Sequence, residues 1–100
     1  METYVILRRG GWGSADELGV AAERSKAVGD QEMSEDIRWI RSYVLDEGDG
    51  RLGTVCIYQA SSPEAIRAHA QRADLPADEV IGVADTVIVR PDPAPAPADA

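Results

Sequence analysis

The feature that most limits the fold of this chain is the alternation of β-type runs with two capped helix starts. The starts are Ser14-Ala15-Asp16-Glu17 and Ser61-Ser62-Pro63-Glu64. In each, a serine can accept a hydrogen bond from an unpaired amide of the first turn, and an acidic residue lies near the positive end of the helix dipole. The sequence therefore predicts one helix from Ser14 to a stop at Gly29, and a second from Ser62 that ends at Leu75-Pro76-Ala77-Asp78. Within the first helix, Gly19 is expected where another backbone approaches closely.

Four β-type runs frame these helices, at residues 4–7, 37–45, 52–60 and 80–89. They are rich in β-branched and aromatic residues. Between the middle two, Asp46-Glu47-Gly48-Asp49-Gly50 supplies residues that tolerate the positive φ of a hairpin turn. The acidic stretch 30–36 is expected to be a solvated loop. The order strand, helix, strand, strand, helix, strand predicts an α+β fold of ferredoxin-like βαββαβ topology, a four-stranded antiparallel sheet with two helices on one face.

The size and charge of the chain bound its organisation and its partners. With 100 residues it has room for one domain, which we place at residues 1–90, followed by a disordered Pro/Ala-rich tail at 91–100. Eighteen acidic and ten basic side chains give a net charge of −8, which disfavours nucleic acid and anionic membranes as partners. No apolar run reaches the ~18 residues of a membrane span. The start of the chain also lacks the order of a signal peptide, so we expect a cytoplasmic protein.

The strands carry apolar residues on both faces, whereas two helices can cover only one. An open face rich in apolar side chains predicts a two-fold homodimer in which two sheets pack together around a barrel-like interior. We assign the aliphatic set Ile40, Val44, Val55 and Ile57 to the helix side. That assignment leaves these residues lining the cavity of the dimer: Trp39, Arg41, Tyr43, Cys56 and Tyr58.

Few side chains could carry chemistry, and each has a structural alternative. His69, the only histidine, lies on the apolar face of the second helix and is either a core imidazole bonded to backbone or a metal ligand or general base. Cys56 is either an inert buried thiol or a soft metal ligand. Arg41 is either an anion clamp or a side chain that reaches the rim of the cavity. One cysteine and one histidine exclude an internal disulfide and a four-ligand Cys/His metal site built by one chain. Trp12, in a glycine-rich connection, is expected to be exposed.

Several blocks of the sequence resemble a family of short proteins. They are Trp39-Ile40-Arg41-Ser42-Tyr43, Cys56-Ile57-Tyr58-Gln59-Ala60 and Glu64-Ala65-Ile66-Arg67-Ala68-His69-Ala70. In these, the chain resembles the nickel-binding-protein-like family, a group frequent in actinobacteria and otherwise described as a domain of unknown function. The resemblance runs from about Tyr4 to Val89. It implies a ferredoxin-like subunit, a homodimer with a shared α+β barrel and, in one type of member, nickel binding.

Two functional hypotheses follow. The first is a small dimeric binding protein for nickel or another divalent transition metal, with His69 as the first ligand and Cys56 and nearby carboxylates behind it. The alternative is a dimeric α+β-barrel enzyme of isomerase, cyclase or monooxygenase type, whose cavity would hold an aromatic or polyketide-like substrate beside Trp39, Arg41, Tyr43 and Tyr58. A dimer that serves only as an interaction module is a third possibility.

Overall fold

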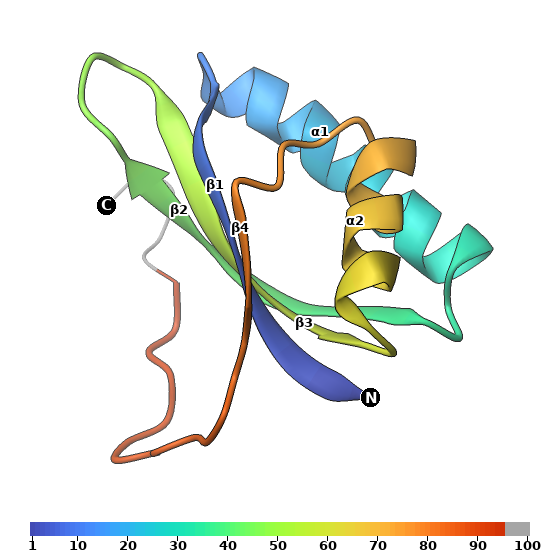
Figure 1. Ribbon diagram of the computed structural model, residues 1–100. Helices are drawn as coiled ribbons and strands as arrows, with labels where there is room; N and C mark the ends of the chain where they lie inside the picture. Colours follow the sequence, from blue (N-terminus) through green and yellow to red (C-terminus); the bar gives the residue numbers. More distant parts are fainter. Residues whose placement is uncertain (96–100) are drawn as a thin grey trace.

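The computed structural model describes residues 1–95, which form one antiparallel sheet with two helices against one of its faces (Figure 1). The sheet has the order β2-β3-β1-β4, as the βαββαβ topology requires. Its strands are β1 (Glu2–Trp12), β2 (Ile37–Asp46), β3 (Leu52–Ala60) and β4 (Glu79–Gly82). The helices are α1 (Ala15–Ala27), a π-helical turn η1 (Val28–Glu32) and α2 (Pro63–Arg72). The predicted ferredoxin-like α+β fold is confirmed.

Both helices begin where their serines predict. The Ser14 hydroxyl accepts from the Glu17 amide at 3.2 Å, and the Ser62 hydroxyl accepts from the Ala65 amide at 3.1 Å. The end of the first helix differs from the prediction, because the chain continues through η1 instead of stopping at Gly29. Gly29 is buried there, and a Cβ at this position would lie 3.7 Å from His69 Nε2. A Cβ would thus make ordinary van der Waals contacts, and Gly29 does not act as a helix stop.

The last strand is shorter than predicted. β4 ends at Gly82, whereas the sequence favoured a strand through Val89. The reason is that β4 pairs only with β1, with Tyr4 opposite Gly82, and β1 begins at Glu2. A β4 that continued to Val89 would run past the end of β1 and find no hydrogen-bond partners there.

Beyond β4 the chain turns back toward β2 without regular structure (Figure 1). Val87, Ile88 and Val89 are exposed on this segment. Asp92 Oδ1 accepts a hydrogen bond from the Tyr43 hydroxyl at 2.5 Å, and Asp92 also pairs with Arg41. Of the tail predicted to be disordered, residues 96–100 lie outside the described part of the chain.

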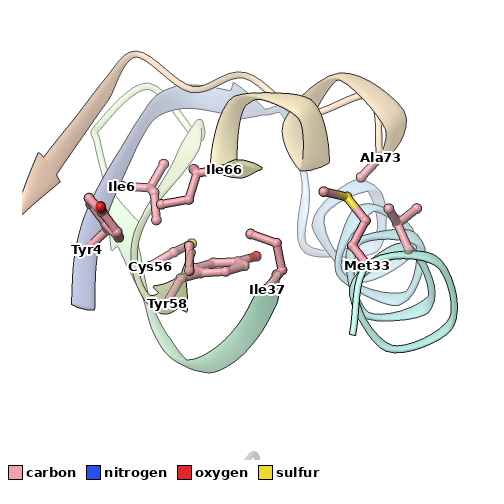
Figure 2. Close-up of a cluster of buried hydrophobic side chains, with 10 residues drawn as sticks. Tyr4, Ile6, Met33, Ile37, Cys56, Tyr58, Ile66 and Ala73 are labelled. Carbon is pink, nitrogen blue, oxygen red and sulfur yellow. The ribbon is translucent and has the colours of Figure 1, made fainter. Parts of the chain in front are cut away.

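The helices cover the face of β1 and β3 that carries Tyr4, Ile6, Cys56 and Tyr58. Cys56 and Tyr58 point into this core together with Ile6, which faces Ile66 of α2 (Figure 2). The assignment of Cys56 and Tyr58 to the open face was wrong, and the prediction that Val55 and Ile57 face the helices was wrong too. The physical reason is volume: the helices present small residues such as Ala70, which leave room for a tyrosine ring.

A bulge in β2 changes which residues share a face. Trp39 is opposite Tyr58, but Arg41 is already opposite Ile57, so Ile40 is an extra residue. Trp39 consequently lies on the helix-covered face, which corrects its assignment to the open one. Arg41 and, two residues on, Tyr43 lie on the open face as predicted. The other two residues assigned to the helix side, Ile40 and Val44, are both exposed.

Gly53 and Gly19 provide a matched test of this packing. A Cβ on Gly53 would lie 2.6 Å from the Arg8 carbonyl oxygen, whereas a Cβ on Gly19 would meet nothing within 4 Å. The close approach expected at Gly19 is therefore wrong. We predict that Gly53→Ala lowers the free energy of unfolding by about 2 kcal/mol through overpacking. Gly19→Ala, in an exposed helical position, should raise it by up to about 1 kcal/mol. Urea unfolding followed by circular dichroism measures both, and equal effects would contradict the packing described here.

Candidate functional site

A cavity of about 40 Å³ lies between α1 and the sheet. Such a volume has room for two or three waters or a ligand of similar size. Its walls come from β1, β2, β3 and α1, with Leu75 after α2. Trp39, Cys56 and Tyr58, predicted to line a cavity between two copies, instead line this one within a single chain. Trp12 lines it as well and is buried, so the prediction of an exposed Trp12 was wrong.

Arg8 is the main charged group of the cavity. Its side chain is 1% exposed, because Tyr4, Ile6 and Arg8 alternate along β1 and all point toward the helices. Nη1 donates to the Pro76 carbonyl at 2.5 Å, and the guanidinium carbon lies 6.0 Å from the centre of the Tyr58 ring. Nη2 is buried and has no hydrogen-bond partner in the described residues. A buried charge without a counterion is costly, which makes Arg8 a candidate ligand for a group that accepts hydrogen bonds.

Sequence reasoning missed Arg8, because the first β-type run was bounded at residues 4–7 whereas β1 extends from Glu2 to Trp12. A signal was present, since Tyr4, Ile6 and Arg8 have the two-residue spacing of one strand face. Arginine is rarely fully buried, however, so the sequence favoured an Arg8 side chain in solvent despite this spacing.

His69 is held in a defined tautomer on α2. Its ring is 1% exposed, and Nε2 lies 3.0 Å from the Ser25 carbonyl oxygen. A carbonyl only accepts, so Nε2 carries the proton and Nδ1 keeps a free lone pair. Nδ1 is buried and has no partner in residues 1–95. Burial lowers the pKa of His69, and the charge of Arg8 lowers it further, against the raising effect of the hydrogen bond to Ser25.

Tyr58 connects the cavity to His69. Its hydroxyl lies 3.0 Å from Ser25 Oγ, its ring centre is 5.5 Å from that of His69, and the Trp39 ring stacks at 6.1 Å. Burial raises the pKa of the Tyr58 hydroxyl, although Ser25 and Arg8 both act to lower it. Tyr58 therefore stays neutral and fixes the arrangement of its neighbours.

Cys56 has the surroundings of a structural thiol. It is buried, and its Sγ donates to Thr54 Oγ1 at 3.3 Å. Within residues 1–95, His, Cys, Asp and Glu side chains nowhere gather in a group of three or more that could hold a metal. The two predicted metal ligands thus belong to the same core without forming a complete site.

The remaining predicted cavity residues lie elsewhere. Arg41 and Tyr43 are on the open face of the sheet, where both contact Asp92. Arg41 thus already has a carboxylate partner within its own chain, whereas Arg8 has none in the described residues.

Comparison with known proteins agrees with this architecture. A family model described as nickel responsive protein SCO4226-like matches residues 4–83. The crystal structure of SCO4226 from Streptomyces coelicolor A3(2) is similar with a TM-score of 0.69 and 24% sequence identity, over 85% of this chain and 99% of that one. At that identity, the likeness to the crystal structure concerns the fold. No curated protein shows a significant match.

The lowered pKa of His69 predicts a specific pH dependence of stability. As the pH falls below about 6.5, the imidazole of the unfolded chain takes up a proton before that of the folded chain. Folding therefore loses up to about 1.4 kcal/mol per pH unit until the folded pKa is reached. His69→Gln keeps a donor for Ser25 but cannot titrate, and the chain has no other histidine. The difference in unfolding free energy between wild type and His69→Gln should shrink between pH 7.5 and pH 5. A difference that is constant with pH would contradict this account of His69.

Proposed function

Because the chain belongs to the SCO4226-like family of nickel-responsive proteins, we propose that it is a small homodimeric binding protein for nickel or another divalent transition metal, with no catalytic step. The observation that carries this proposal is the state of His69. Its Nε2 proton is donated to the Ser25 carbonyl, and Nδ1 is left as a neutral lone pair. A backbone carbonyl that holds the other ring nitrogen is the usual support of a metal-binding histidine.

The chain supplies only part of a metal site. The donors suited to nickel are His69 Nδ1 and the Cys56 thiol, and imidazole and thiolate both bind late divalent metals. The described residues add no third such ligand, and Arg8 places a positive charge in the same core. These residues therefore fit a weak and exchangeable ion whose other ligands are waters or small anions, and do not fit a permanently bound cofactor. Since Nδ1 is buried, a metal would reach it through local opening around α2.

The homodimer is supported by the open face of the sheet. Val5, Leu7, Val55 and Ile57 lie in two central rows of this face, and Tyr43 and Ile81 beside them are 44% and 46% exposed. Neither helix covers these residues. A second copy packed against the same face would bury them and give the barrel-like interior of two stacked sheets.

The enzyme alternative has less support. It needs Trp39, Arg41, Tyr43 and Tyr58 around one substrate, but Trp39 and Tyr58 face the helices while Arg41 and Tyr43 face away from them.

A cytoplasmic location and a lack of nucleic-acid partners belong to the same proposal. The net charge of −8 supports the second point. None of the helices in residues 1–95 has the length and apolar character needed to cross a membrane.

Metal binding can be tested by thermal unfolding of protein that carries no affinity tag. Nickel chloride should raise the unfolding midpoint of the wild type, since a ligand at a hundred times its Kd stabilises by about 2.7 kcal/mol. Magnesium, which prefers oxygen ligands, should not. His69→Gln should abolish the nickel effect and Cys56→Ala should weaken it. Arg67→Gln, on the exposed side of the same helix, should leave it unchanged. An equal nickel effect in His69→Gln would place the metal elsewhere on the chain.

The dimer is tested by sedimentation at micromolar concentration. The wild type should sediment as a dimer, and Ile57→Lys should give a folded monomer because two lysines would be buried in the centre of the paired faces. Val20→Lys makes the same change at a residue of α1 that is 62% exposed and should remain dimeric. A wild-type monomer would overturn this part of the proposal.

A further inference from the structure

The cavity beside Arg8 has an unusual balance of charge. A guanidinium keeps its positive charge in proteins and offers five N–H donors. Here Nη1 donates to the Pro76 carbonyl, and Nη2 is buried without a hydrogen-bond partner in the described residues. Arg8 lines the cavity, and the lining includes no aspartate or glutamate. Arg41, in contrast, has Asp92, and Arg9 has Glu47. We propose that this cavity binds a small planar oxyanion, of the size of formate, acetate or bicarbonate, with Arg8 as its charged ligand.

The hydroxyl groups of Ser42 and Thr54 add two hydrogen-bond donors to the guanidinium of Arg8. Ser42 Oγ accepts from Trp39 Nε1 at 2.8 Å, and Thr54 Oγ1 accepts from the Cys56 thiol at 3.3 Å. Each of these oxygens has an accepting role already, so its own hydrogen is available to donate. Both residues line the cavity together with Arg8. A site that offers a guanidinium and hydroxyl donors suits an acceptor-only ligand such as a carboxylate, and repels a cation.

Size and access restrict the ligand further. About 40 Å³ holds two or three waters, which matches an ion of three or four heavy atoms and excludes an aromatic acid. The lining residues Ala22, Trp39, Ser42 and Leu75 are only partly buried, so the cavity reaches the surface between α1 and β2. The rest of the lining is largely apolar, and this low-polarity surrounding strengthens the attraction between Arg8 and a bound anion. The proposal does not depend on metal binding at His69.

The cavity carries its own spectroscopic reporter. The chain has two tryptophans, Trp12 and Trp39, and both line the cavity. We expect sodium formate, sodium acetate or sodium bicarbonate, at constant ionic strength, to change the tryptophan emission of the full chain along a saturable curve. Sodium benzoate should not. Saturation by formate or acetate identifies a small organic acid as the ligand, and saturation by bicarbonate alone identifies the inorganic ion. A linear response to every salt, or a saturable response to benzoate, would overturn the proposal.

Substitutions at neighbouring arginines separate the cavity from general salt effects. Arg8→Met keeps most of the side-chain volume and removes the charge, so it should weaken anion binding at least ~10-fold. Arg9→Met makes the same change one residue along β1, where the side chain is exposed, and should leave the titration curve unchanged.

Thermal unfolding distinguishes a loss of anion binding in Arg8→Met from a loss of the fold. In anion-free buffer, Arg8→Met should unfold at the same temperature as the wild type or a higher one, because the substitution removes an unpaired buried charge. Added anion should raise the unfolding midpoint of the wild type and leave that of Arg8→Met unchanged. If Arg8→Met does not fold, Thr54→Val, which removes one hydroxyl donor and no charge, should still weaken binding. Unchanged affinity in Arg8→Met or in Thr54→Val would contradict the assigned site.

Discussion

Small residues on both helices, beside the larger Ile66 and His69 of α2, leave the space that the Tyr58 ring fills. Ala21 and Ser25 of α1 and Ala70 of α2 project little volume, so β1 and β3, together with Ile66 and His69 of α2, fill the core. Tyr58 supplies the largest apolar part of it, and its ring is in contact with Trp39, His69 and the guanidinium of Arg8. Where Ala21, Ala22 and Ser25 of α1 face the sheet, a small cavity remains. The fold and the candidate site therefore have the same physical origin.

The electrostatics of the interior are opposite to those of the chain as a whole. The protein carries a net charge of −8. Within residues 1–95, however, the buried side chains that have a nitrogen without a hydrogen-bond partner are the charged Arg8 and the neutral His69. The charge of Arg8 adds to burial in lowering the pKa of His69, which favours the proposed role of His69 as a ligand, but the same charge opposes a divalent cation nearby. This balance is why we propose an exchangeable metal at His69 and an anion beside Arg8. An anion in the cavity would also offset part of the repulsion that a metal meets.

The open face of the sheet and the segment after β4 both bear on the proposed homodimer. Arg41 and Tyr43 point away from the helices and contact Asp92 of that segment. Val87, Ile88 and Val89, which have the composition of a strand, lie exposed between β4 and this contact. Apolar strand-forming residues left without a partner in one chain are consistent with a homodimer. The chemistry proposed for the core does not require residues from a second copy, whereas the barrel of the enzyme alternative does.

The sequence by itself determined the order of the elements, both helix starts, the hairpin turn and the bounds of β3. Each of these depends on interactions within a few residues, such as a serine that caps its own helix or a glycine that permits a turn. Only the tertiary structure decided that Cys56 and Tyr58 face the helices, that Ile40 is a bulge, that β4 stops at Gly82 and that Arg8 is buried. These outcomes depend on the volume offered by a facing helix and on the register between strands distant in sequence. A pattern of alternating residues shows that a strand has two faces, but it does not identify the face that the helices will cover.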